Sequence, residues 1–248
     1  MNIPQKLAAA FAQRQALKAI AGLNNFDRER VGAIVRAAAA GGATFVDIAA
    51  APELVRYARS LANLPICTSA VEPELLAATV AAGADLVEIG NFDSFYAQGR
   101  RFEGPEVLAL TRATRALLPE VALSVTVPHI LALDEQVQLA EELVRAGADI
   151  IQTEGGTSSQ PANGGVLGLI EKAAPTLAAA HAISRAVNVP VLCASGLSDV
   201  TVPMAIAAGA AGVGVGSAIN QLDSEVAMVA AVRRLADAVV TARASVRA

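Results

Sequence analysis

The chain has 248 residues, of which 54% are hydrophobic, 17% charged and only 3% aromatic, and its formal net charge is −4. This length is close to the ~250 residues of one (β/α)8 barrel, so we expect residues 1–248 to form a single domain. The weak negative charge, with no basic cluster larger than Arg100-Arg101, argues against a nucleic-acid-binding surface. A small molecule is therefore the expected partner.

Neither a membrane span nor a secretory signal is expected. The apolar run 200–222 is long enough to cross a bilayer, but Pro203 and several glycines divide it into helix, turn and strand. The apolar stretch 7–12 is too short for the core of a secretory signal. We therefore expect a cytoplasmic protein without membrane contact, in which Cys67 and Cys193 are unpaired thiols of buried strands. A homo-oligomer is left open.

The expected elements alternate between strand and helix along the whole chain. A short helix at residues 4–15 is expected to close the bottom of the fold. Strands are expected at residues 17–22, 44–49, 65–69, 85–90, 121–127, 149–154, 191–195 and 212–216. Helices are expected at 28–40, 52–62, 73–82, from 105, at 134–146, 175–187 and 200–208, and from 224.

One short phrase, a glycine-alanine turn leading into an apolar strand, occurs at residues 42–47, 83–88, 147–152 and 209–214. Glycine can take the left-handed conformation that ends a helix, and an apolar strand is typical of a parallel sheet buried on both faces. Pro65 and Pro190 lead into two similar strands, so a quarter of the chain recurs half a barrel later. This symmetry predicts a (β/α)8 TIM barrel, with a doubly wound open sheet as the alternative.

Two loops, 91–104 and 155–173, are longer than a barrel requires. Both follow the carboxyl ends of strands, where barrel enzymes build their active sites. The second loop is rich in glycine, and we expect it to be a mobile lid that brings Thr157 and Ser158 over a bound ligand.

Polar residues share one register of the repeated strands. Asp47, Glu88 and Gln152 occupy equivalent positions, and Glu154 lies two residues further along the same face. Lys18, in the first strand, is the expected cation among them. It is either a catalytic base or Schiff-base lysine, or only the counter-ion of Asp47 and Glu88 in a polar network that fixes the register of the barrel.

The two histidines have different expected roles. His129 follows the fifth strand and is a candidate general acid or base. His181 falls in the middle of a helix and is expected at the surface or in packing. No metal site is predicted.

A phosphate site is predicted at the ends of the last two strands. Glycines there let the backbone approach an anion, and N–H groups at the start of a short helix point at it. Close helix packing is the alternative reason for these glycines. The expected ligand-binding residues are Gly155, Gly156, Thr157, Ser195, Gly196, Gly214, Gly216 and Ser217.

Four phrases on four different strands resemble one family over essentially the whole chain. They are KAIAGLNNFD at 18–27, EIGNFD at 88–93, QTEGGT at 152–157 and CASGL at 193–197. The family is the cyanobacterial and plastid one called hypothetical chloroplast reading frame twenty-three. The resemblance implies a phosphate-binding barrel from a photosynthetic lineage and supplies no reaction.

Three functions follow from these features. The first is an enzyme of aldolase, isomerase or synthase type that acts on a small phosphorylated metabolite, with catalytic groups among Lys18, Asp47, Glu88, His129 and Glu154. The second is an oxidoreductase that binds flavin mononucleotide (FMN) in the same phosphate site. The third is a non-catalytic metabolite sensor or assembly partner.

Overall fold

The computed structural model describes residues 2–96, 98–156 and 159–246. Its strands form a closed barrel in which all neighbours are parallel and the last strand pairs with the first. This confirms the (β/α)8 barrel and excludes the open sheet. The strands are β1 Ala16–Ile20, β2 Phe45–Ala49, β3 Ile66–Ala70, β4 Leu86–Ile89, β5 Ala122–Thr126, β6 Ile150–Gln152, β7 Val191–Ala194 and β8 Gly212–Val215.

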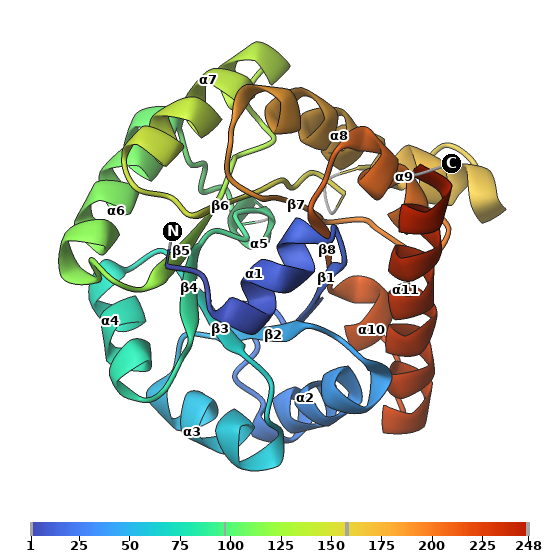
Figure 1. The fold of residues 1–248 in the computed structure, drawn as a ribbon, viewed down its shortest axis with the longest axis horizontal. Helices are drawn as coiled ribbons and strands as arrows, with labels where there is room; N and C mark the ends of the chain where they lie inside the picture. Colours follow the sequence, from blue (N-terminus) through green and yellow to red (C-terminus); the bar gives the residue numbers. More distant parts are fainter. Residues whose placement is uncertain (1, 97, 157–158, 247–248) are drawn as a thin grey trace.

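Helices surround the barrel, and one helix crosses its axis at the end seen in Figure 1. The short helix α5, after β4, was not expected from the sequence, whereas the short helix α10 directly after β8 lies where the predicted phosphate site needs a helix start. The helices are α1 Gln5–Ala12, α2 Arg28–Gly41, α3 Pro52–Leu61, α4 Pro73–Ala81, α5 Asp93–Tyr96, α6 Gly104–Leu117, α7 Leu133–Arg145, α8 Gly165–Ala186, α9 Val202–Ala208, α10 Ser217–Asn220 and α11 Glu225–Val246.

The repeated glycines end four helices, as the sequence predicts. Gly42, Gly83, Gly147 and Gly209 have φ values of 90°, 108°, 105° and 118°. A side chain is strained in this left-handed region, whereas glycine adopts it readily. Each glycine is followed within three residues by β2, β4, β6 or β8, so the repeat sets the alternation of the barrel.

The expected start of α8 is wrong by ten residues. Pro175 suggested a first-turn position, but α8 begins at Gly165 and contains Pro175 in its interior. Proline removes the hydrogen bond that the carbonyl of Glu171 would accept. The hydroxyl of Ser159 donates to that carbonyl instead, at 3.3 Å. The expected lid at 155–173 is therefore largely helix in its second half, and Thr157 and Ser158 lie outside the described residues.

By length and composition, α8 could also cross a membrane. This property alone indicates little, because a helix that packs on a barrel meets the same test. In the structure α8 packs against β7 and its neighbours α7 and α9.

The helix α1 closes the amino-terminal end of the barrel, as expected. Its Leu7 and Phe11 are buried against the lowest layer of interior side chains. The rings of Phe11 and Phe45 meet edge to face with centroids 6.2 Å apart. The opposite, carboxyl-terminal end of the barrel remains available for a site.

Both cysteines are buried free thiols, as the sequence predicts. Burial raises the pKa of Cys193 to about 11 and raises that of Cys67 as well. Because the thiolate is the reactive form, neither side chain is a good nucleophile.

Replacing Phe11 with alanine should lower the free energy of unfolding by about 3–5 kcal/mol, because a buried aromatic ring is lost from a packed layer. Urea unfolding followed by circular dichroism measures this change. Lys6→Ala, an exposed change on the same helix, is the control and should leave stability within about 0.5 kcal/mol. Equal stability of Phe11→Ala and the wild type would show that α1 does not contribute to the core.

Candidate functional site

A buried lysine lies at the centre of the barrel. Lys18 on β1 is completely buried, and its Nζ donates to Glu88 Oε2 at 2.7 Å and to Gln152 Oε1 at 2.8 Å. Asp47 Oδ2 is 3.7 Å from the same nitrogen. Burial alone would lower the pKa of Lys18, but the charges of Asp47 and Glu88 raise it well above its ordinary value. Lys18 is therefore a charged counter-ion at neutral pH, which does not favour the base and Schiff-base roles.

The two acids below the mouth are fully buried and hydrogen-bonded. Ser69 Oγ donates to Asp47 Oδ1 at 2.5 Å, and Ser124 Oγ donates to Glu88 Oε2 at 2.7 Å. Asn91 Nδ2 reaches both carboxylates, at 3.4 Å from Asp47 and 3.2 Å from Glu88. Burial raises the pKa of Asp47 to about 6, the charge of Lys18 opposes this, and the charge of Glu88 adds to it.

A second polar cluster, the mouth cluster, consists of Asp93, Tyr96, His129 and Glu154. Glu154 Oε1 accepts from Tyr96 Oη at 2.7 Å and lies 3.1 Å from His129 Nδ1. Glu154 Oε2 accepts from the backbone N–H of Asp93 at 3.2 Å. His129 Nδ1 is also 3.4 Å from Asp93 Oδ1. The exits of β4, β5 and β6 thus bring four titratable side chains together.

The pKa values of Glu154, His129 and Tyr96 in the mouth cluster are shifted by burial and by their neighbours. Burial raises the pKa of Glu154, although the bonds from His129 and Tyr96 oppose this. Burial alone would lower the pKa of His129, but its bond to Glu154 and the charge of that carboxylate raise it. Burial and the same carboxylate raise the pKa of Tyr96 well above its ordinary value, so the phenol stays protonated and donates to Glu154.

A cavity of about 240 Å3 lies at this end of the barrel. On one side it is lined by Asp93 and Glu154, and on the other by Gly196, Gly216 and Ser217. Among the described residues, the N–H groups of these last three donate no hydrogen bond to the protein. The cavity therefore joins an acidic side to a side with free backbone donors.

The loop after β6 presses directly on the loop after β7. A Cβ on Gly156 would lie 2.3 Å from Gly196 Cα, so only glycine fits at this contact. Gly196 has φ 74° and Ser195 has φ 76°, which is unusual for a residue with a side chain. Ser195 Oγ donates to Asp93 Oδ2 at 2.8 Å. The β7 exit is thereby tied to the mouth cluster.

Lys172 of α8 lies beside the same loop. A Cβ on Gly196 would be 3.3 Å from Lys172 Cγ, so the aliphatic part of the Lys172 side chain packs beside Gly196. The sequence did not indicate this residue, because it falls in the segment that we expected to be a loop.

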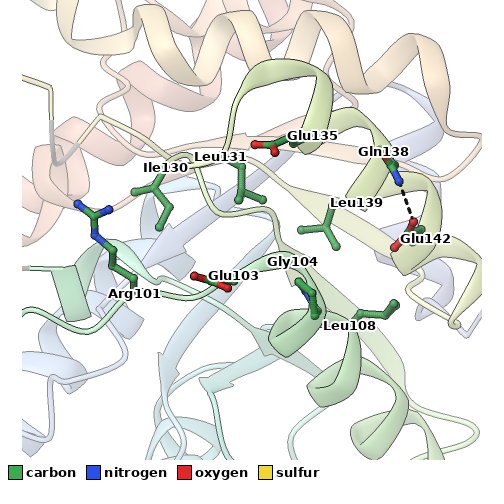
Figure 2. A pocket seen from close by; sticks show the side chains of 11 residues that line it. Arg101, Glu103, Gly104, Leu108, Ile130, Leu131, Glu135, Gln138, Leu139 and Glu142 are labelled. Carbon is green, nitrogen blue, oxygen red and sulfur yellow. Dashed lines mark hydrogen bonds between the residues drawn. The ribbon is translucent and has the colours of Figure 1, made fainter.

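A larger cavity of about 600 Å3 lies between α6 and α7, outside the barrel mouth (Figure 2). Its polar side chains are largely engaged with each other or with helix ends: Gln138 bonds Glu142 at 3.2 Å, and Glu135 caps the start of α7 through the N–H of Ala132. The buried titratable residues gather at the smaller cavity, so we place the candidate site there.

The expected site residues fall into separate places. Lys18, Asp47 and Glu88 form the buried layer beneath the cavity and do not line it, whereas Glu154 does. The cavity is also lined by Ser195, Gly196, Gly216 and Ser217. Neighbouring atoms pack closely against Gly155, Gly156 and Gly214, which do not line the cavity. His181 is exposed on α8, as expected. The sequence reasoning missed Asp93 and Tyr96, which lie on α5.

Lys18→Met should lower the free energy of unfolding by about 3–5 kcal/mol, because it leaves two buried carboxylates without their cation. Chemical denaturation measures the loss. In the double variant Lys18→Met/Glu88→Gln part of the stability should return, since one uncompensated charge is removed. Lys6→Met on the surface is the control. A Lys18→Met protein as stable as the wild type would contradict the counter-ion role.

Asp47 should contribute to the stability of the folded protein at low pH and lose that contribution as the pH rises. Its pKa in the folded protein, about 6, is above its ordinary value of 3.8, so the folded state holds the proton more tightly than the unfolded state. The stability of the wild type relative to Asp47→Asn should therefore fall as the pH rises from about 4 to about 6, and then stay constant. Paired urea titrations across this range measure it. A constant or rising difference would show that the folded-state pKa is not raised.

Comparisons with known sequences show the family of this chain. A family model described as a protein of unknown function (DUF561) matches residues 1–245. The chain is 39% identical to uncharacterized protein ycf23 of Pyropia yezoensis, over 92% of this chain and 84% of that one. It is 42% identical to the protein of the same name in Cyanophora paradoxa, over 88% of this chain and 89% of that one.

Solved structures show the same fold at low identity. The (S)-3-O-geranylgeranylglyceryl phosphate synthase of Thermoplasma acidophilum, in complex with its substrate sn-glycerol-1-phosphate, matches with a TM-score of 0.63 at 10% identity, over 94% of this chain and 97% of that one. A 3-hexulose-6-phosphate synthase matches with a TM-score of 0.62 at 17% identity, over 90% and 99%. The thiamine phosphate pyrophosphorylase of Pyrococcus furiosus gives 0.61 at 19%, over 93% and 98%. This chain thus shares its fold with these barrels. By sequence, the chain belongs to the DUF561 family, together with the plastid ycf23 proteins.

Proposed function

We propose that this protein is an enzyme of aldolase, isomerase or synthase type that acts on a small phosphorylated metabolite. The observation that carries the proposal is that one cavity is lined by Asp93 and Glu154 on one side and by the backbone donors of Gly196, Gly216 and Ser217 on the other. One side suits an anion, and the other suits a reacting carbonyl or hydroxyl group. Such a pairing of a positioning group with a reactive cluster is what catalysis on a phosphorylated substrate needs.

The phosphate is expected at the exits of β7 and β8. Barrel enzymes often bind phosphate at this place, through loops that expose backbone N–H groups. The N–H groups of Gly196, Gly216 and Ser217 make no bond to the described protein. Lys172 packs beside Gly196, and we expect its ammonium group to add a positive charge at this end. The structural relatives named for phosphorylated compounds, including one bound to sn-glycerol-1-phosphate, support this assignment.

The reacting end is expected at the mouth cluster. Glu154 is almost fully buried and held in place by Tyr96 and by the backbone of Asp93. Fixed carboxylate and imidazole groups at a cavity wall can move charge at a substrate without first reorganising. The lower layer around Lys18 then serves as the support for this cluster.

The size of the cavity favours a small metabolite over FMN. Ligand pockets for drug-sized molecules have ~300–1,000 Å3, and the cavity here has about 240 Å3. An FMN molecule would need the loops around the mouth to move outward. A purified protein without visible flavin absorbance would agree with the smaller ligand.

Gly216→Asp should weaken the binding of inorganic phosphate and of glycerol phosphate by at least tenfold. A like charge about 5 Å from the phosphate costs roughly 3 kcal/mol at an effective dielectric constant near 20. Isothermal titration calorimetry measures both ligands. Gly164→Asp introduces the same charge at an open position with no atom within 4 Å and should leave the affinity unchanged. Equal affinities in all three proteins would place the phosphate elsewhere.

A further inference from the structure

We propose that Asp93, His129 and Glu154 bind a divalent transition-metal cation, such as Zn²⁺ or Mn²⁺, at the mouth of the barrel. The three residues come from the exits of β4, β5 and β6, and one ligand atom from each lies within 4.8 Å of the others. This inference deepens the proposed function. It rests on the proposed function only in taking the substrate to lie in the cavity beside these residues.

The spacing of the ligand atoms fits a shared cation. His129 Nδ1 is 3.1 Å from Glu154 Oε1 and 3.4 Å from Asp93 Oδ1. Ligands that bind a cation at ~2.1 Å and at angles between octahedral and tetrahedral are ~3.0–3.4 Å apart. The distance between His129 Nδ1 and Asp93 Oδ1 is too long for a strong N–H to oxygen hydrogen bond. A proton on Nδ1 would therefore bond Asp93 only weakly, whereas a cation at this place would bind both carboxylates.

The charge of the cluster points the same way. Glu154 is 3% exposed, and within the described residues its ion pairs are with His129 alone. Lys18, which is buried in the barrel interior, is already bound by Glu88 and Gln152. A buried carboxylate is costly without a positive partner, and a divalent cation would supply one to Glu154.

The groups around the three ligands are placed as supporting groups of a metal site are. Tyr96 donates to Glu154, Ser195 donates to Asp93 Oδ2, and Asp93 Oδ1 lies 3.4 Å from His129 Nδ1. Such outer hydrogen bonds orient the ligands and tune their affinity. One imidazole with two carboxylates suits Zn²⁺ or Mn²⁺ better than Ca²⁺ or Mg²⁺.

The position of the site gives the cation a chemical role. Asp93 and Glu154 line the cavity, so coordination positions on that side face the substrate. A cation there would polarise a carbonyl oxygen of the substrate as a Lewis acid. The phosphate at Gly196 and Gly216 would hold the substrate at its other end.

The chain offers a clean test, because it contains two histidines only. Untagged protein is stripped with EDTA, loaded with Zn²⁺ or Mn²⁺, desalted and analysed for bound metal by mass spectrometry, with affinities from calorimetry. The wild type should retain one cation per chain. His129→Gln and Asp93→Asn should each weaken binding by roughly tenfold or more. His181→Gln, at the exposed histidine of α8, is the matched control and should bind as the wild type does.

Two results would overturn the metal site. The first is a metal affinity of the wild type that is no higher than that of the triple variant Asp93→Asn/His129→Gln/Glu154→Gln. The other is binding that His129→Gln leaves unchanged. Circular dichroism of each metal-free variant shows whether it is folded, and the visible spectrum of Co²⁺-loaded protein reports ligation independently. Calorimetry with inorganic phosphate in EDTA separates the two proposals, because loss of metal binding with intact phosphate binding would remove only this inference.

Discussion

The salt bridge between Lys18 and Glu88 is the interaction on which the barrel mouth depends. An ammonium group at the barrel axis is tolerated because two carboxylates and the amide of Gln152 surround it. A slip of one residue in any of these strands would turn its polar side chain away from Lys18 and leave buried charges apart. The polar layer therefore selects one register of the parallel strands, which apolar packing alone would specify less sharply.

This layer also positions the site above it. Asn91 reaches down to Asp47 and Glu88 and adopts a left-handed backbone conformation, with φ 61°. The chain after β4 is thereby set so that Asp93 reaches His129 and Glu154. On β6, Gln152 serves the lower layer, and Glu154 serves the mouth cluster two residues later. A change at Lys18 would consequently be felt at the mouth even though Lys18 does not line the cavity.

The fold could be predicted from the sequence because its signals are local and repeated. Glycines such as Gly42 and Gly147 end helices by backbone conformation alone, and the apolar strands follow at once. Pro175 misled the prediction, because the hydroxyl of Ser159, in the loop before α8, donates to the carbonyl that loses its helical hydrogen bond. Asp93 was not predicted as a site residue because its partners come from other strands, although it ends the phrase EIGNFD that carries the family resemblance.

Charge balance limits how the cavity can work. A bound phosphate would share about 240 Å3 with two carboxylates, and like charges at such distances repel. Backbone N–H groups supply only partial positive charge, and Lys18 is already engaged by Glu88 below. Lys172 can serve the phosphate end, because its side chain packs beside Gly196. The acidic end therefore needs positive charge of its own, as a proton on His129 or as a bound cation, before an anionic substrate can enter.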